Sequence, residues 1–176
     1  MDLKGLLMYR SKCQGKKGAI PLNKWMTSAI PLKDKDEDEI FNELKWKIVK
    51  NEGSNIEFFN EVPLFIGKFG ITAQVDSIGY QGSFEEDYIR ILLIEVKKDL
   101  TNSQNISNVI GQLFVDEFVF KEDQEIKQII KDIQHLKNLE IKKIVVTRKI
   151  LDWGFELLKN LGIKVYVKEV IPYALK

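Results

Sequence analysis

The chain has 176 residues, of which 27 are Lys or Arg and 26 are Asp or Glu, so its formal net charge is +1. Hydrophobic residues make up 44%, which is too many for a disordered chain and typical of a globular domain with one core. No apolar run approaches the roughly 20 residues that cross a bilayer, and the N-terminus lacks the apolar stretch of a secretory signal, so no membrane partner is expected. The single cysteine, Cys13, excludes an internal disulfide and a cysteine-based zinc site, and it favours a reducing, cytoplasmic environment.

Basic residues are concentrated near the N-terminus. Residues 1–35 contain eight Lys or Arg and two Asp, a local net charge of +6 that the near-neutral total hides. Glycines and prolines in this stretch predict turns and short extended pieces. We therefore divide the chain into a basic N-terminal extension, residues 1–35, and a domain, residues 36–176. Lys16 and Lys17 of the extension are candidates for phosphate contacts. The alternative is a solvated extension that packs its apolar residues on the core or on a second subunit.

Hydrophobic periodicity predicts the order of the elements in the domain. A helix is expected from Asp36, whose carboxylate can cap it, to about residue 50. Strands follow at 56–66, 71–79 and 88–97, and their short connections favour an antiparallel meander. The third strand is apolar on both faces, as expected for a central strand that is covered on each side.

The second half of the chain alternates between helix and strand. Helices are predicted at 105–120 and 122–139, followed by a strand at 141–147, a helix at 149–161 and a strand at 163–169. Strand, helix and strand at this spacing form a right-handed crossover with parallel pairing. The sequence thus predicts an α/β fold in which a mixed central sheet is flanked by helices.

Two carboxylates are predicted to converge at one end of the sheet. Glu95 and Lys97 share a face of the third strand, because side chains alternate along a strand. Asp76 interrupts the apolar second strand, and pairing through the turn at 80–87 places it at a height comparable to that of Glu95. Two such carboxylates repel each other unless a cation lies between them, and their hard oxygen ligands suit Mg²⁺ or Mn²⁺. The alternative is that Glu95 and Lys97 simply emerge into solvent at the end of the strand.

Asp76, a gap of 18 residues and then Glu95-Val96-Lys97 resemble the motif of the PD-(D/E)XK nuclease superfamily, which has the restriction-endonuclease-like fold. The resemblance covers roughly residues 37–170, and the predicted order matches the αβββαβ core of the family with a further helix and strand. It implies a Mg²⁺-dependent or Mn²⁺-dependent deoxyribonuclease that hydrolyses phosphodiester bonds, an endonuclease of the restriction or Holliday-junction-resolvase kind. DNA is then the expected partner, and a homodimer is left open.

The resemblance also implies a role for each matching residue. The implied catalytic residues are Asp76, Glu95, Lys97 and Gln112, and the implied metal ligands are Glu43, Asp76, Glu95 and the Val96 carbonyl. Lys97 would position or activate the attacking water, and Gln112 would orient water or contact the DNA backbone. Further candidates for nucleic-acid contact are Lys98, next to the site, and Asn105 and Asn108, on the same helical stripe as Gln112. For these three residues a solvent-facing role is the alternative.

The chain departs from the family pattern at two positions. Val75 replaces the proline that names the motif, and Asp116 stands where RecB-like members have a tyrosine four residues after the glutamine. Two other hypotheses remain open: a catalytically inactive nucleic-acid-binding module on the same fold, and an unrelated α/β domain with an accidental motif. The second of these would be supported if Asp76 and Glu95 were distant. His135, the only histidine, is expected on the surface.

Overall fold

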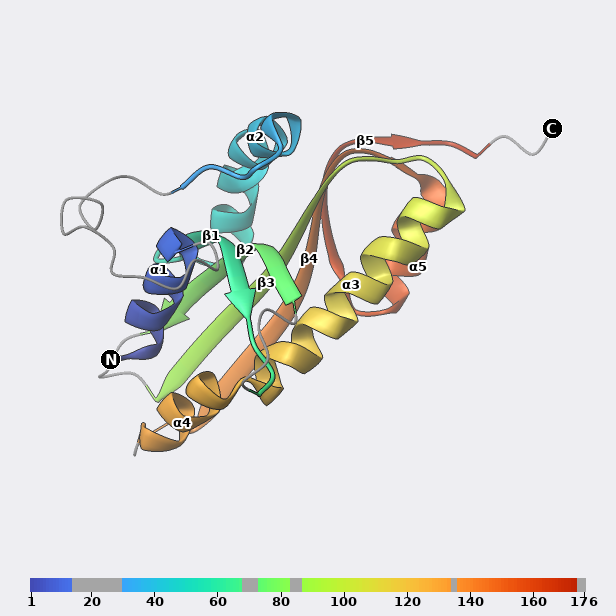
Figure 1. Cartoon of the computed structure of the whole chain (residues 1–176). Helices are drawn as coiled ribbons and strands as arrows, with labels where there is room; N and C mark the ends of the chain where they lie inside the picture. Colours follow the sequence, from blue (N-terminus) through green and yellow to red (C-terminus); the bar gives the residue numbers. More distant parts are fainter. Residues whose placement is uncertain (14–29, 68–72, 83–86, 134–135, 174–176) are drawn as a thin grey trace.

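The computed structural model describes residues 1–13, 30–67, 73–82, 87–133 and 136–173, which form an α/β structure (Figure 1). Its helices are α1 (Leu3–Cys13), α2 (Lys35–Glu52), α3 (Ser103–Glu122), α4 (Gln124–Asp132) and α5 (Asp152–Asn160). Its strands are β1 (Glu57–Leu64), β2 (Ala73–Gly82), β3 (Tyr88–Leu100), β4 (Asn138–Leu151) and β5 (Lys164–Ile171). The strands form one sheet in the order β1-β2-β3-β4-β5.

The pairing of the strands follows the predicted topology. β1, β2 and β3 form an antiparallel meander, whereas β3, β4 and β5 are parallel to one another. β3 is therefore the central strand, and it is buried on both faces over most of its length, which explains its continuous apolar run. The predicted α/β class, with a mixed sheet flanked by helices, is confirmed.

Helices cover both faces of the sheet (Figure 1). α2 packs on one face, and the apolar side chains of α1, α3, α4 and α5 pack on the other. Because side chains alternate along β3, Ile94 and Val96 point towards α2, and Glu95 points to the face that α3 covers. The carboxylate of a core strand is thereby directed at a helix. None of the described helices is long and apolar enough to cross a membrane.

The first turn of α2 is fixed by a side-chain cap. The cap is Asp34 and not Asp36, because Asp34 Oδ1 accepts hydrogen bonds from the backbone N–H groups of Asp36 (2.8 Å) and Glu37 (3.1 Å). Asp36, Glu37 and Asp38 then fill the first turn, where the helix dipole favours negative charge. The cap therefore determines which of these acids faces the end of β3.

Residues 3–13 form a helix, so the prediction of turns and extended pieces is wrong for this part of the N-terminal segment. Three leucines of α1 are buried in the core, and Arg10 is buried in ion pairs with carboxylates at the start of α4. The prediction was based on glycines and prolines that occur farther along the segment. Residues 3–13 instead contain leucines at helical spacing. Lys16 and Lys17 lie outside the described residues.

α4 is shorter than the helix predicted over 122–139. It ends at Asp132, and β4 already begins at Asn138. Ile133 and Leu136 still pack against the core, but from beyond the end of the helix, so they continued the helical spacing in the sequence without continuing the helix. His135 lies outside the described residues.

Candidate active site

The candidate site lies where the sheet divides. The antiparallel pairing of β2 with β3 ends at Ser77 and Ile94; beyond this pair, β2 continues beside β1 and β3 continues beside β4. Asp76 is the next residue of β2, and its Oδ2 accepts a hydrogen bond of 2.9 Å from the backbone N–H of Val96. A carboxylate thus takes the donor that strand pairing leaves unused, and this hydrogen bond holds Asp76 in the fork between β2 and β3.

Asp76, Glu95 and Lys97 converge in this fork. Lys97 Nζ lies 3.3 Å from Asp76 Oδ2 and 3.2 Å from Glu95 Oε2. Burial alone would lower the pKa of Lys97, but the surrounding carboxylates raise it above its ordinary value, so the ammonium group stays charged. Because both carboxylates contact Lys97, Asp76 and Glu95 are not distant, and a large distance between them is what would have supported an accidental motif. Glu95 does not emerge into solvent, because it is completely buried, whereas the Lys97 side chain is partly exposed.

Glu95 is the most unusual group of the site. Neither of its carboxylate oxygens has a hydrogen-bond partner, since Lys97 is close enough for an ion pair but is not aligned as a donor. Burial, followed by the nearby charge of Asp76, raises the pKa of Glu95 to about 10. In the absence of a cation other than Lys97, Glu95 therefore carries a proton at neutral pH. An unsatisfied buried carboxylate in a folded protein requires an explanation.

Asp116 also belongs to the site, although the sequence pattern does not predict it there. It projects from α3, is only 2% exposed, lies within hydrogen-bonding range of the Glu95 carboxylate, and its Oδ2 has no hydrogen-bond partner. Burial raises the pKa of Asp116 to about 6. The signal in the sequence was its position three residues after Leu113 on the buried stripe of the helix, where a carboxylate is out of place.

The acid that α2 contributes is Glu37 rather than Glu43. Glu37 Oε1 lies 3.8 Å from Lys97 Nζ, and burial raises the pKa of Glu37 to about 7. Glu43 forms an ion pair with Lys168 of β5 and is mostly exposed. The interval of six residues turns the two side chains roughly 120° apart around the helix, so they cannot share one site. The structure therefore does not bring Glu43 to Asp76 and Glu95.

The remaining predicted residues lie around the site rather than in it. Gln112 is partly buried and lies one turn before Asp116 on the same side of α3. Asn105 and Asn108 are exposed near the start of that helix: Asn108 Oδ1 accepts from Gln104, and Asn105 Nδ2 donates to the backbone carbonyl of Asp99. Among the described contacts, none joins these three residues to the carboxylates of the site, and they remain candidates for contact with a bound polymer.

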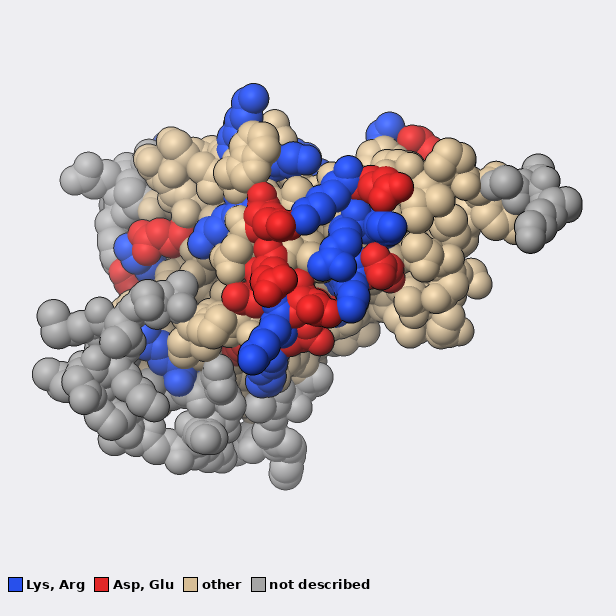
Figure 2. Space-filling model, turned by 90° about the horizontal axis from the view of Figure 1, so that it is seen from above, with Lys and Arg blue, Asp and Glu red and all other residues tan. Residues whose placement is uncertain are grey.

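Lys98 points to the opposite face of β3 from Lys97. Its Nζ lies 2.6 Å from Asp36 Oδ2 in an exposed ion pair, which ties the end of β3 to the first turn of α2. Seen from the α2 side, acidic and basic side chains are intermixed over the middle of the molecule instead of forming a surface of one sign (Figure 2). The net charge of +6 on residues 1–35 is also partly balanced by other residues of the protein, because Lys4 pairs with Glu57 and the buried Arg10 pairs with Asp123.

The donor set of the site suits a hard divalent cation. Four carboxylates, from Asp76, Glu95, Asp116 and Glu37, surround or approach the single positive charge of Lys97. With all groups ionised this leaves a net charge of −3 in a partly buried fork. Among the described residues, no three Asp, Glu, His or Cys side chains already enclose a common metal position. The chemistry nevertheless fits, because buried carboxylate oxygens without a donor are ligands that Mg²⁺ or Mn²⁺ prefers.

Comparisons with protein-family models, curated proteins and solved structures find no match to this chain. The site is therefore interpreted from its own geometry.

Proposed function

We propose that the protein is a Mg²⁺-dependent or Mn²⁺-dependent DNA nuclease that hydrolyses phosphodiester bonds as an endonuclease, on a restriction-endonuclease-like core. The observation that carries this proposal is Glu95, a completely buried carboxylate without a hydrogen-bond donor, held beside Asp76 and Lys97 at the fork of the sheet. A carboxylate pair with a lysine at this position supports metal-assisted hydrolysis, and the spacing of the three residues is what resembles the nuclease motif.

Asp76 and Glu95 would hold the cation, and the Val96 carbonyl is a third candidate ligand. The bound cation would lower the pKa of a water and neutralise charge that develops on the phosphate. The hydrogen bond from Val96 N–H fixes the orientation of the Asp76 carboxylate independently of any ligand. This preorganisation removes the need for the side chain to move when the site is filled.

Lys97 would contact the attacking water or a phosphate oxygen. Its side chain is 29% exposed, and its ammonium group pairs with Asp76, Glu95 and Glu37, which fix its position. A compact, strongly hydrated cation is suited to this role, because it can donate to a water and to an oxyanion together. A cation bound by Asp76 and Glu95 would release Lys97 from these carboxylates for such contacts.

Within the described part of the chain, DNA contact would come from individual groups, because acidic and basic side chains are intermixed on the α2 side (Figure 2). Lys98, Asn105, Asn108 and Gln112 lie near the end of β3 and along α3, and they are the described candidates. Lys98 would have to exchange Asp36 for a phosphate, which an exposed ion pair allows at little cost. With few phosphate contacts, DNA binding should depend on salt only modestly.

The test is cleavage of supercoiled plasmid, linear duplex, single-stranded and four-way-junction DNA with Mg²⁺, with Mn²⁺ and with EDTA. We expect metal-dependent cleavage of at least one substrate by the wild-type protein and loss of that cleavage in Asp76→Asn. Asp132→Asn is the matched control, since Asp132 is an exposed acid at the end of α4 and lies outside the fork. Cleavage that survives in Asp76→Asn would show that this site does not perform it. Binding of DNA without cleavage of any substrate would favour the inactive nucleic-acid-binding module.

A further inference from the structure

Asp116 Oδ2 is buried without a hydrogen-bond partner among the described residues. The described structure shows what a satisfied buried aspartate looks like: Asp123 receives Arg10 at 2.6 Å and the backbone N–H groups of Phe65 and Ile126. Asp116 is equally buried, but its Oδ2 has no hydrogen-bond partner, and its close neighbour is another carboxylate, that of Glu95. Replacing Asp116 by an apolar residue would suit the core better, so the carboxylate points to a ligand.

Two buried side chains are aimed at each other across the interface between β3 and α3. Three of their four oxygens, both from Glu95 and Oδ2 from Asp116, lack a partner. Two carboxylates within hydrogen-bonding range of each other repel unless a proton or a metal ion lies between them. Lys97 does not fill the role, because its ammonium group pairs with Glu37, Asp76 and Glu95 and forms no salt bridge with Asp116 among the described contacts.

We propose that Asp116 is a third carboxylate ligand of the divalent cation at this site, contributed by α3 to the buried side of Glu95. The inference rests on the metal-binding part of the proposed function and not on the nuclease reaction. The cation would then be held between the sheet and α3 by Asp76, Glu95 and Asp116, two ligands from strands and one from a helix. All three are oxygen donors, so the site would select Mg²⁺, Mn²⁺ or Ca²⁺ over the softer transition metals.

A ligand on α3 also gives the site a rigid support on each side. α3 runs along the sheet with its apolar stripe buried in the core, so Asp116 has little freedom to move away from Glu95. Gln112, one turn earlier on the same helix, would then lie next to the bound cation rather than apart from it. This arrangement would explain why an aspartate stands on an otherwise apolar helical stripe.

The experiment measures Mn²⁺ binding by the metal-stripped full-length protein, from the electron paramagnetic resonance signal of free Mn²⁺. We expect Asp116→Asn to weaken binding by about tenfold or more. Glu117→Gln is the matched control, because its carboxylate lies on the next residue of the same helix and pairs with Lys121 and Lys143. Asp116→Ser removes the carboxylate with a smaller side chain as a second variant, and circular dichroism verifies that each variant is folded.

The outcomes separate this inference from the proposed reaction. Weaker Mn²⁺ binding in both Asp116 variants, with Glu117→Gln unchanged, supports Asp116 as a ligand. Unchanged binding in the Asp116 variants together with weaker binding in Asp76→Asn overturns the inference and leaves the two-carboxylate site. Absence of Mn²⁺ binding by the wild-type protein overturns the inference and the metal-dependent function together. A wild-type protein that binds Mn²⁺ through Asp116 but cleaves no DNA would support the inference while the nuclease proposal fails.

Discussion

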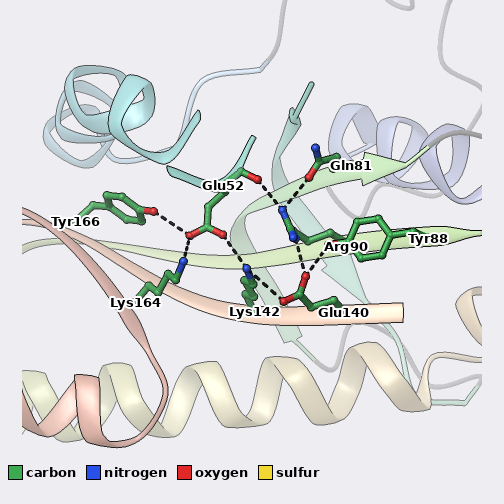
Figure 3. Close-up of polar contacts among 8 residues, drawn as sticks. All are labelled: Glu52, Gln81, Tyr88, Arg90, Glu140, Lys142, Lys164 and Tyr166. Atoms are coloured by element: carbon green, nitrogen blue, oxygen red, sulfur yellow. Dashed lines mark hydrogen bonds and ion pairs between the residues drawn. The ribbon is translucent and has the colours of Figure 1, made fainter. Parts of the chain in front are cut away.

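Two buried glutamates of this protein lie in opposite electrostatic surroundings. Glu52 ends α2, and Glu95 lies on β3; the side chains of both are fully buried. Glu52 accepts hydrogen bonds from Lys142, Lys164 and Tyr166, and although burial opposes it, these donors hold the pKa of Glu52 below its ordinary value (Figure 3). Glu95 has no donor, and its pKa is raised to about 10.

The surroundings of Glu52 are those of a structural network. Figure 3 shows its three donors pointing at the carboxylate from β4 and β5, with Arg90 beside them contacting Gln81 and Glu140. Arg90 also donates to the backbone carbonyl of Glu52, which caps the end of α2 with a positive charge. Here every charge has a partner within the fold. The difference teaches that burial alone does not mark a binding site; a buried carboxylate without a hydrogen-bond donor does.

The largest difference between the two glutamates should appear in DNA cleavage. Glu95→Gln removes a carboxylate that would contribute several kcal/mol to stabilising the transition state, so we expect cleavage to slow by about a thousandfold. Glu52→Gln makes the same chemical change outside the fork and should leave the rate per folded molecule nearly unchanged. Single-turnover cleavage with Mg²⁺ measures both. Equal losses in the two variants would remove the functional distinction between these regions.

The free energy of unfolding should fall more in Glu52→Gln than in Glu95→Gln, the reverse of the order expected for cleavage. Glu52→Gln leaves Lys142 and Lys164 without their carboxylate, and the free energy of unfolding should fall by about 2 kcal/mol. Glu95→Gln removes a group that burial and Asp76 disfavour, so it should not destabilise the metal-free protein. Urea unfolding in EDTA compares the variants. Marked destabilisation by Glu95→Gln would mean that Glu95 has a structural partner.

The pKa shifts of the two glutamates should make the free energy of unfolding depend on pH in opposite directions. The folded protein keeps the proton on Glu95 up to about pH 10, whereas the unfolded chain releases it near the ordinary value of 4.5. Between these values the unfolded state binds fewer protons, so the free energy of unfolding should fall as pH rises. The lowered pKa of Glu52 acts in reverse, and its contribution is lost as pH falls below its ordinary value. Thermal unfolding of metal-free wild type and Glu95→Gln from pH 5 to 9 isolates the Glu95 contribution, which should vanish in the variant.

The smallest effect is expected at Glu43. Its ion pair with Lys168 is exposed on the surface, so Glu43→Gln should change the free energy of unfolding by less than about 1 kcal/mol. It should leave Mg²⁺-dependent cleavage unchanged, whereas Glu37→Gln should reduce it by releasing Lys97 from one of its three partners. Parallel cleavage assays of these two variants compare the acids of one helix. A loss confined to Glu43→Gln would contradict the assignment of Glu37 to the site.

The sequence predicted what depends on short-range periodicity. The alternation of Glu95, Val96 and Lys97 and the apolar interruption at Asp76 were enough to predict their convergence, because the β2–β3 turn links adjacent antiparallel strands. The contribution of α2 was not predictable at the level of one residue. Its acidic first turn offers several carboxylates, and the choice of Glu37 depends on the angle at which the helix crosses the end of β3.

The place of Asp116 in the site was not predictable from the sequence for a related reason. The apolar spacing of α3 predicts its buried stripe, but which residue of β3 that stripe meets is set by the angle at which the helix packs on the sheet. The helix of residues 3–13 was missed because composition over a long window outweighed the spacing of three leucines within it. Local patterns thus gave the strands and their order, whereas contacts between a helix and the sheet required the structure.

The most direct test of the unsatisfied carboxylate is a carbon-13 NMR titration of the glutamate side chains, with Glu95→Gln and Glu52→Gln used for assignment. Both groups are observed in one sample, so the structural glutamate serves as the internal reference. We expect Glu52 to be ionised at neutral pH and Glu95 to remain protonated until about pH 10 without metal. Addition of Mg²⁺ at neutral pH should ionise Glu95 and leave Glu52 unchanged. Ionisation of Glu95 near its ordinary value, or a Glu95 signal that Mg²⁺ does not move, would contradict the proposal that this carboxylate binds a cation.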